Sequence, residues 1–539
     1  MILVKKRISA FMLALIISIG AAVMPNTASA KTTEYNEPLV CVGMYAVTPS
    51  LDTTRLFSIN RSDNGFDIGF SNGSDGFVKA YSLSETALVL FPMMNAKYEN
   101  GIVTADENGN IGGYSAVLGR FTSYQSAKTA AKAKGGFVAV VNGGYEARAY
   151  ASNTAAEAKR ASGGRTVVGP ASGGLYALDE KGKIIFSFEA TDKKLAVRAQ
   201  NGGAVEIPMR YRTGGTTYYQ YRGFFEYSVK SGKLFMLNFV GLEEYTKCVM
   251  ANEIGTNFSK ETRKAFAVLA RTVAVYSKHQ KLGFDVCSNS ACCQVYHGIY
   301  RMSEENNALV DSTRGLICTY KGAPITVLYH NSNGGASCSS VAAWGGDEVP
   351  YLTTVFQEEY DDGDKWTHNF TKEEFFEYIT SRRTFSSLKD DNLTVTIHST
   401  DPYGSSYITA LTISDGSGNR VLVETSEDIR SACGFTSANF TVEYNTEANV
   451  LTADGKVEKQ KVAGVLTADG IKSFNSFADS YKTSDGNILA PQSITVNGAG
   501  VGHGVGFSAT GSEKLSKDGY SYKYILSFFF NGTDLTVAK

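Results

Sequence analysis

The chain has almost no net charge, little proline, and no long apolar run after its first 30 residues. Its 539 residues carry a formal charge of −1, which argues against nucleic acid as the main partner because phosphate binding needs clustered cations. Only 10 prolines accompany 54 glycines, a balance typical of a globular protein rich in strands and turns. No later segment is apolar enough to cross a membrane as a helix, so we expect no transmembrane anchor after leader removal.

The first 30 residues have the pattern of a secretory signal peptide. Three cations at 5–7 precede an apolar run at 8–23, and the small triplet Ala28-Ser29-Ala30 follows. The run is shorter than the roughly 20 residues of a membrane-spanning helix, and the triplet suits signal peptidase. We predict a secreted protein of the cell wall or extracytoplasmic space; an uncleaved anchor is the alternative.

Alternating strand-like and helix-like periods predict an α+β, multi-domain, strand-rich fold. Short apolar runs between turn residues make 31–110 and 166–221 β-rich regions. Between them, 111–165 has the pattern of a small β-α-β-β-α module. The remainder, 222–539, contains a pair of helices and a β-hairpin insertion at about 436–490, and the family motifs described below lie in it.

The first helix of that pair ends in an acid, Glu253. Leu242, Tyr245, Val249 and Glu253 follow one another at three- and four-residue steps, so the acid continues an apolar stripe. Burial there would raise its pKa, and an acid that stays protonated near neutral pH can donate a proton in catalysis. The alternative is an idle, solvated carboxylate at a frayed helix end beside Gly255.

The module at 111–165 resembles the sporulation-related repeat. A strand ends in Leu118-Gly119-Arg120-Phe121 and is followed by Ser123 and an Ala-rich helix. That family binds glycan strands stripped of their peptides, which implies a SPOR-like glycan-binding module here. Arg148 and Tyr150, on its third strand, are the residues to test. An unrelated α+β sandwich is the alternative.

Six motifs after residue 222 occur in the order and spacing of one family. They are Leu242-Glu243-Glu244-Tyr245, Ala251-Asn252-Glu253-Ile254, Ala270-Arg271-Thr272-Val273-Ala274, Phe284-Asp285-Val286-Cys287, Cys293-Gln294-Val295-Tyr296 and Tyr329-His330-Asn331-Ser332-Asn333-Gly334-Gly335, and the tail Gly502-His503-Gly504-Val505-Gly506-Phe507-Ser508 continues the pattern. With these motifs the chain resembles the stage II sporulation protein D family, which includes the amidase-enhancer proteins.

The resemblance implies a peptidoglycan lytic transglycosylase that cleaves MurNAc-GlcNAc bonds in denuded glycan strands. Glu253 would act first as the acid that protonates the leaving oxygen and then as the base. Because the 6-hydroxyl of the sugar closes an anhydro ring, the second carboxylate of ordinary glycosidases is not required. The alternative is a non-catalytic, glycan-binding amidase enhancer that recruits or stimulates a cell-wall amidase, and a zinc hydrolase is a third reading.

The resemblance also suggests residues that bind substrate. Arg271 matches the arginine of the family and is expected to hold Glu253 or a sugar hydroxyl, unless it forms a structural ion pair. Gln294 suits hydrogen bonding to sugar hydroxyl or acetamido groups. Tyr296 suits stacking on a pyranose ring but is equally suited to the core.

Two glycine-rich turns complete the expected sugar site. Ser332 and Asn333 lie in a polar turn after an apolar strand predicted at 325–329, where loops often carry function, although a plain turn is the alternative. His503 lies between glycines that let substrate approach, and we expect it to contact sugar or orient the acid unless it is merely packed. Ser508 follows, but the glutamine that the family usually has next is alanine here.

Three of the eight cysteines crowd one short segment: Cys287, Cys292 and Cys293. Some members of the family carry a zinc site built from a Cys-x4-His-Cys run and an upstream histidine. Here Cys292 occupies the histidine position and His279 is the upstream candidate, which implies a closed, structural Cys3His zinc site. A disulfide between Cys287 and Cys293, or with another cysteine, is the alternative that export permits. No organic cofactor is predicted.

Overall fold

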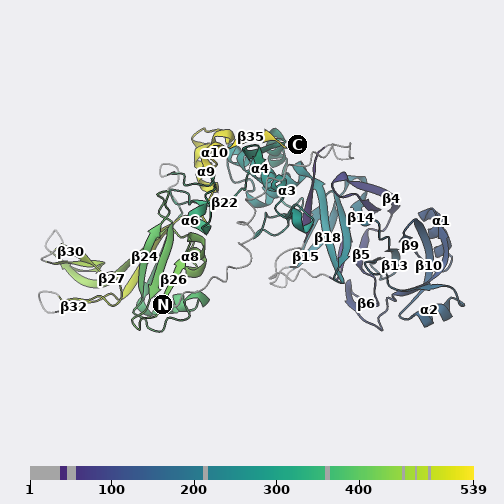
Figure 1. Cartoon of the computed structure of the whole chain (residues 1–539), viewed down its shortest axis with the longest axis horizontal. Coiled ribbons are helices and arrows are strands. Elements are labelled where there is room, and N and C mark those ends of the chain that lie inside the picture. Colours follow the sequence, from purple (N-terminus) through teal and green to yellow (C-terminus); the bar gives the residue numbers. More distant parts are fainter. Residues whose placement is uncertain are drawn as a thin grey trace.

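The structure is a computed structural model that describes residues 37–44, 56–210, 216–357, 364–451, 456–467, 470–482 and 487–538. The predicted signal peptide at 1–30 lies outside these residues. The architecture is α+β and strand-rich, as predicted. Figure 1 shows the sheets of the N-terminal half at one end, a group of helices in the middle, and the sheets of 365–499 at the other end. No described helix has both the length and the apolarity needed to span a membrane.

A seven-stranded sheet joins the start of the described chain to the helical centre. Its strands, in spatial order, are β19 (Val286–Cys287), β1 (Leu39–Met44), β18 (Lys233–Gly241), β17 (Phe224–Lys230), β14 (Lys194–Ala199), β3 (Phe66–Ser71) and β4 (Phe77–Leu83). β1 pairs antiparallel with β18 and parallel with β19. Because β18 leads into the helix of Glu253 and β19 contains Cys287, this sheet positions both segments.

A ten-stranded sheet contains most of the remaining N-terminal strands. Its order is β11 (Val167–Val168), β8 (Tyr114–Phe121), β10 (Gly144–Ser152), β9 (Phe137–Val141), β13 (Ile184–Phe188), β12 (Leu175–Leu178), β5 (Ala87–Pro92), β2 (Ser58–Arg61), β15 (Val205–Arg210) and β16 (Thr216–Tyr221). Side chains from both large sheets share one hydrophobic core, with Ile68 and Leu90 almost completely buried in it. A short hairpin, β6 (Ala96–Glu99) and β7 (Ile102–Ala105), lies beside them.

The predicted β-α-β-β-α module is present but is not a separate body. Helices α1 (Tyr124–Lys132) and α2 (Ala155–Ala161) connect β8, β9, β10 and β11 as the pattern predicts. However, β9 also pairs in parallel with β13, which joins the module to the strands on either side. The predicted boundaries at 110, 165 and 221 therefore pass through shared sheets, because strand pairing joins segments that local periodicity cannot connect.

The helix that carries Glu253 is α3 (Leu242–Glu253), and it is buried over most of its surface. Leu242, Tyr245 and Val249 are at most 3% exposed, so the predicted apolar stripe is confirmed. α3 packs against α4 (Lys260–Tyr276) and α5 (Glu304–Ser312). After Ile254 the chain leaves the helix at Gly255, whose φ of +64° suits glycine.

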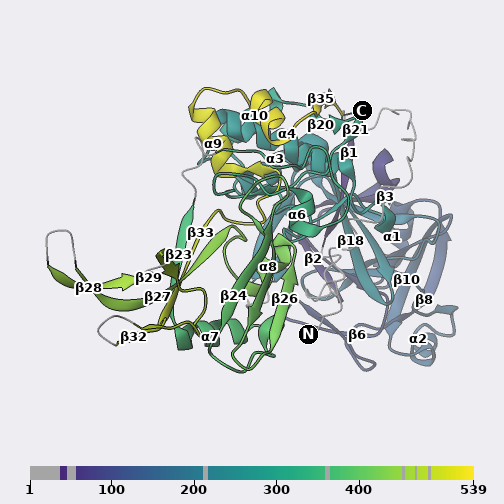
Figure 2. The same ribbon diagram turned by 60° about the vertical axis from the view of Figure 1, so that its left-hand side comes forward.

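The end of the chain returns to this helical centre. Helices α9 (Ala509–Lys517) and α10 (Tyr522–Phe529) pack against α4, and Figures 1 and 2 both show them beside it. A three-stranded sheet of β21 (Ala323–Pro324), β20 (Leu316–Tyr320) and β35 (Asp534–Val537) closes this part.

A short parallel pair brings the two predicted glycine-rich turns together. β22 (Tyr329–His330) pairs with β34 (Phe507–Ser508), and Ser332 exchanges backbone hydrogen bonds with Val501. The strand predicted at 325–329 was wrong for most of its length, since only its last residue lies in β22 and 325–328 adopt no regular structure.

The sheets at the far end come from residues 365–499. They are a four-stranded sheet of β23 (Lys365–Thr371), β33 (Ser493–Ala499), β27 (Phe440–Leu451) and β28 (Val457–Val462), and a three-stranded sheet of β24 (Thr394–Thr400), β25 (Ile408–Ser414) and β26 (Arg420–Glu424). Three helices accompany them: α6 (Ser340–Trp344), α7 (Lys372–Thr380) and α8 (Ser426–Cys433).

The predicted insertion at 436–490 is built from hairpins. β27 and β28 extend beyond the sheet, followed by the pairs β29 (Gly464–Thr467) with β30 (Gly470–Ser473) and β31 (Tyr481–Lys482) with β32 (Ile488–Leu489). Figure 1 shows this arm projecting from the end of the molecule. Residues 452–455, 468–469 and 483–486 of this segment lie outside the described residues.

Candidate functional site

The carboxyl group of Glu253 is held at the last residue of α3 by two neutral donors. The backbone N–H of Val295 donates to Oε1 at 2.6 Å, and the hydroxyl of Tyr329 donates to the same oxygen at 2.9 Å. Within the described residues, Oε2 accepts no hydrogen bond. The two oxygens therefore differ: Oε1 is anchored, and Oε2 is the atom on which a transferable proton can reside.

Burial raises the pKa of Glu253, and the two hydrogen bonds oppose that rise without cancelling it. The predicted direction of the pKa shift is confirmed. The two anchoring groups were not predicted as parts of the site. Tyr329 was visible within a motif without an assigned role, whereas the N–H of Val295 is a backbone group that no residue type reveals.

Arg271 is completely buried and binds another acid of the same helix, Glu243. Its Nε donates to Oε1 of Glu243 at 2.9 Å, and its Nη2 donates to Oε2 at 2.7 Å. Its Nη1 donates to the carbonyl of Leu316 at 2.8 Å. The structural ion pair left open by the sequence is the arrangement found, so the expected contact of Arg271 with Glu253 or a sugar is corrected.

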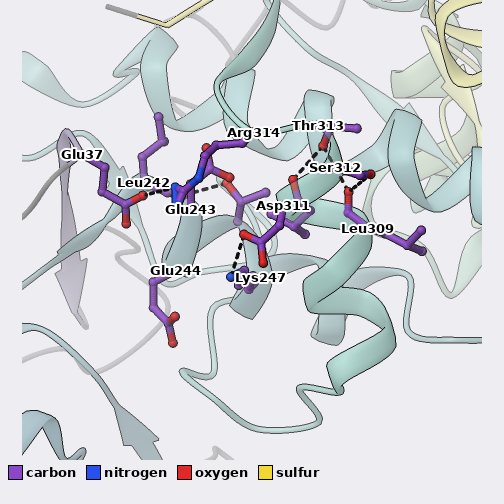
Figure 3. A network of polar contacts seen from close by, with 12 residues as sticks. Glu37, Leu242, Glu243, Glu244, Lys247, Leu309, Asp311, Ser312, Thr313 and Arg314 are labelled. Atoms are coloured by element: carbon purple, nitrogen blue, oxygen red, sulfur yellow. Dashed lines mark hydrogen bonds and ion pairs between the residues drawn. The ribbon is translucent and has the colours of Figure 1, made fainter.

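A polar network surrounds this amino end of α3 (Figure 3). Glu37 and Arg314 form an ion pair with Oε2 and Nη1 3.0 Å apart. The backbone N–H of Glu243 donates to Glu37, so a side chain from the beginning of the described chain caps α3, whose own N-cap residue is Gly241. One turn later, Lys247 contacts Asp311 of α5 at 2.9 Å. These contacts fix the position of the helix that carries Glu253.

Five further residues predicted to bind substrate have no exposed surface. They are Gln294, Tyr296, Ser332, Asn333 and Ser508, each 0% exposed. The Tyr245 hydroxyl donates to Oε1 of Gln294 at 3.1 Å, and the Tyr296 hydroxyl donates to Oδ1 of Asn238 at 2.6 Å. Tyr296 is therefore a core residue, which was the alternative in the sequence, and Gln294 is a buried part of the loop whose Val295 N–H binds Glu253.

The polar residues of the two turns stabilise the turns themselves. Nδ2 of Asn333 donates to Oε1 of Gln357 at 2.6 Å, and the Ser508 hydroxyl caps α9 by accepting the N–H of Gly511 at 3.1 Å. Buried polar groups must find partners inside the protein, and in these turns the backbone supplies many of them. The expectation that Ser332, Asn333 and Ser508 contact sugar is corrected accordingly.

His503 is the predicted sugar contact that keeps some exposure. Its ring lies between His330 and Trp344, with centroids 5.5 and 5.4 Å away. Its Nδ1 accepts the N–H of Val505 at 3.0 Å, and burial lowers its pKa to about 4. It is therefore a neutral ring at neutral pH, and it faces the backbone carbonyl of Tyr329, so it reaches the acid through Tyr329 and not directly.

The four predicted metal ligands converge. One ligand atom from each of His279, Cys287, Cys292 and Cys293 lies within 4.8 Å of the others. The sulfurs of Cys287 and Cys293 are 3.6 Å apart, and Sγ of Cys292 lies 3.2 Å from Nε2 of His279. Two thiolates on one tetrahedral zinc ion, with bonds of about 2.3 Å, would be roughly 3.8 Å apart, so the spacing fits the ion.

The chemistry of the cluster also fits a metal. All eight cysteines are free, so the alternative disulfide is absent from the structure. Contacts with Cys287, Cys293 and His279 lower the pKa of Cys292 and favour its thiolate, the form that ligates metal. The contacts among the three thiols raise the pKa of Cys287 and of Cys293, so without a metal the charge resides on Cys292. Three thiolates and one imidazole would fill a tetrahedral zinc ion, which is the pattern of a structural site.

The cluster is adjacent in sequence to the group that anchors the acid. Val295, which donates to Glu253, follows Cys293 by two residues. A metal bound by Cys292 and Cys293 would hold the 287–295 loop in the position in which its N–H reaches Oε1. A metal bound here would therefore support the site of Glu253 by fixing the geometry of the backbone beside it.

In the SPOR-like module, the two residues named as candidates for glycan binding, Arg148 and Tyr150, have different surroundings. Arg148 is 2% exposed and is fully engaged by two acids, with Nη1 of Arg148 2.7 Å from Oε1 of Glu189 and Nη2 2.9 Å from Oε2 of Glu146. It cannot present its charge to a glycan. Tyr150 has a φ of +59° and lines a cavity of about 180 Å³ with Asn110 and Lys183 among its other walls. A glycan-binding role for this module stays a prediction.

Comparisons with known proteins find similarity to one family over the region that contains this site. The family model described as "Stage II sporulation protein" matches residues 230–320. The chain is 28% identical over 295 residues to the amidase enhancer of Bacillus subtilis, and the match covers 54% of this chain but only 40% of that protein. It is 25% identical over 321 residues to the stage II sporulation protein D of Bacillus amyloliquefaciens, covering 56% of this chain and 75% of that protein.

An uncharacterised protein of Brachyspira hyodysenteriae is 26% identical over 347 residues, covering 62% of this chain and 77% of its own length. The family match at 230–320 contains α3 with Glu253, the Arg271 ion pair, the cysteine cluster and the Val295 loop. The family match and these relatives support a resemblance of the chain to the stage II sporulation protein D and amidase-enhancer family.

Proposed function

We propose that the protein is a lytic transglycosylase that cleaves MurNAc-GlcNAc bonds in denuded peptidoglycan glycan, with Glu253 as its acid and base. One observation carries the proposal. The carboxyl group is partly buried with a raised pKa, and both of its donors bind Oε1. A protonated Oε2 at the end of a rigid helix is suited to donate a proton to a leaving oxygen.

The reaction needs one carboxyl group to act twice. Oε2 gives its proton to the glycosidic oxygen as the bond from that oxygen to C1 of MurNAc breaks. The carboxylate that results is stabilised by the Val295 N–H and the Tyr329 hydroxyl. It then accepts the proton of the MurNAc 6-hydroxyl while that oxygen attacks C1. The anhydro ring closes, and Glu253 regains its proton.

Digestion of peptide-free glycan strands tests this proposal. The mature chain should release products that end in anhydro-MurNAc, detected by mass spectrometry, and Glu253→Gln should release none above background while keeping its melting temperature. Glutamine preserves the shape of the side chain but has no acidic proton. If the glutamine variant retained full activity, the assignment of Glu253 would be wrong.

The alternative function is that of a non-catalytic amidase enhancer, and the similarity to the protein of that name supports it. In this case the chain would bind glycan without releasing products and would raise the rate of a cell-wall amidase. Both functions fit a protein that is exported to the cell wall by the leader at 1–30, and both use a zinc ion at His279, Cys287, Cys292 and Cys293 only to hold structure. The absence of anhydro products together with amidase stimulation would favour the enhancer.

A further inference from the structure

An exposed aromatic ring and a cation lie next to the end of α3. Tyr300 is 43% exposed, and the guanidinium carbon of Arg301 lies 5.2 Å from the centre of its ring. Nδ2 of Asn252 donates to the backbone carbonyl of Tyr300 at 3.1 Å. The pair is thus tied to the residue that immediately precedes Glu253.

The base under this pair is built from stacked rings. His297 stacks on Tyr219 with centroids 4.3 Å apart and planes at 6°, and Tyr300 meets Tyr219 edge-on at 5.3 Å. Burial lowers the pKa of His297, so its ring is neutral at neutral pH. Neutral aromatic rings beside one cation suit an anionic sugar.

The backbone of this segment is fixed against β16. The N–H of Ile299 donates to the carbonyl of Gln220 at 2.8 Å. Gly298 has a φ of +59°, and a Cβ at this position would lie 2.0 Å from the same carbonyl oxygen. Only glycine permits so close an approach, which holds the following residues, Tyr300 and Arg301, in place.

Arg301 has two features that a purely structural residue does not need. Its φ is +61°, a conformation that costs a non-glycine residue of order 1 kcal/mol and that concentrates at functional sites. Its side chain is exposed, and it forms no ion pair with any described residue. Two other exposed arginines near α3, Arg222 and Arg314, are paired with Glu244 and Glu37. Arg301 is therefore a positioned cation that lacks an internal anion.

We propose that Arg301 and Tyr300 recognise the free lactyl carboxylate of peptide-stripped MurNAc and so select denuded strands. Removal of the stem peptide exposes a carboxylate on the lactyl group, whereas an intact strand has an uncharged amide at that position. A guanidinium binds a carboxylate through two parallel hydrogen bonds, and the exposed tyrosine ring stacks on the pyranose. The inference rests on the proposed function, because it names the group of the glycan, the lactyl carboxylate, by which the protein would recognise the substrate of Glu253.

The experiment compares two forms of one substrate. Denuded strands are used as such or after conversion of the lactyl carboxylates to primary amides with carbodiimide and ammonia. Arg301→Gln should lower kcat/KM on the carboxylate strands by about three- to tenfold, as expected for one exposed charge-assisted contact. On the amidated strands the variant and the wild type should be equal. Arg420→Gln, which removes an exposed arginine at the start of β26, is the matched control and should change neither value.

Binding of the same strands to Glu253→Gln, with and without Arg301→Gln, keeps the test independent of turnover. If the wild type made no anhydro product, the proposed enzyme activity would fail, but a preference of the protein for carboxylate over amidated strands that Arg301→Gln removes would still support the inference. An equal loss on both strands, or no loss on either, would overturn it. Tyr300→Phe should bind normally and Tyr300→Ala weakly, since stacking needs the ring and not the hydroxyl.

Discussion

The two ends of helix α3 each carry a glutamate, and they are built in opposite ways. At the amino end, Glu243 is 4% exposed and forms a buried ion pair with Arg271 through two hydrogen bonds. At the carboxyl end, Glu253 is partly buried and is bound by two neutral donors on a single oxygen. No cation compensates Glu253 within the described residues, and its pKa is raised by burial.

The difference separates an acid fixed as a charge from an acid that is able to exchange a proton. A carboxylate held by a guanidinium through both oxygens has no free oxygen for a proton, and it is useful only as a fixed charge. A carboxyl group with one anchored oxygen and one free oxygen can lose and regain a proton without moving. Two acids ten positions apart on one helix can therefore differ in their chemistry, and their partners distinguish them where residue type does not.

The largest effect that separates the two ends is expected from Glu243→Gln. Removing one partner of a buried ion pair leaves the Arg271 charge uncompensated, and we expect a loss of about 3 to 5 kcal/mol in the free energy of unfolding. Urea unfolding measures it. Glu253→Gln in the same assay should unfold at the wild-type midpoint or above, because no buried cation depends on it. Equal destabilisation by the two variants would remove the distinction between the ends.

The comparison also shows how far the sequence could predict the site. The stripe of Leu242, Tyr245 and Val249 is a local pattern with helical period, so it placed Glu253 correctly at a partly buried helix end. The cysteine cluster could also be predicted from a local pattern, since three of its four residues lie within seven positions of the sequence. The α+β class and the elements of the 111–165 module also follow from local periodicity.

What could not be predicted depends on long-range pairing. Arg271 matches a family motif and was expected to hold Glu253 or a sugar hydroxyl, with a structural ion pair as the alternative. The acid that it binds is Glu243, and the sequence does not distinguish these partners. The pairing of β1 with β18 joins residues about 200 positions apart, so local patterns could not predict that these segments share a sheet. Burial of these polar residues could not be predicted either. Ser332, Asn333 and Ser508 have the residue types of a sugar site, yet their hydrogen bonds stabilise turns inside the protein.

The next effect in size is expected at the carboxyl end, from loss of the metal. Cys292→Ser should remove one zinc ion per chain, measured by elemental analysis, and should lower kcat by about ten- to a hundredfold, the range seen when groups that support a site are lost. The reason is that the 287–295 loop would no longer hold the Val295 N–H against Glu253. Cys433→Ser, a free buried cysteine on α8 distant in sequence from the cluster, is the control and should keep its zinc. A wild-type protein without zinc, or full activity without it, would contradict the role given to the cluster.

The smallest effect is expected from Tyr329→Phe, which removes one of the two donors to Oε1 and leaves the ring in place. The Tyr329 hydroxyl lowers the pKa of Glu253, so its removal should raise that pKa further, by about one unit. The acid works only while it is protonated, and the rate falls as the pH rises through its pKa. The alkaline limb of the kcat profile should therefore move to higher pH by about one unit. Tyr245→Phe is the matched control, because the Tyr245 hydroxyl binds Gln294 and not the acid, and its profile should keep the wild-type limb. A shift of the alkaline limb to lower pH would mean that Tyr329 stabilises the protonated form of Glu253. The role given to the Tyr329 hydroxyl, as a donor that stabilises the carboxylate through Oε1, would then be wrong.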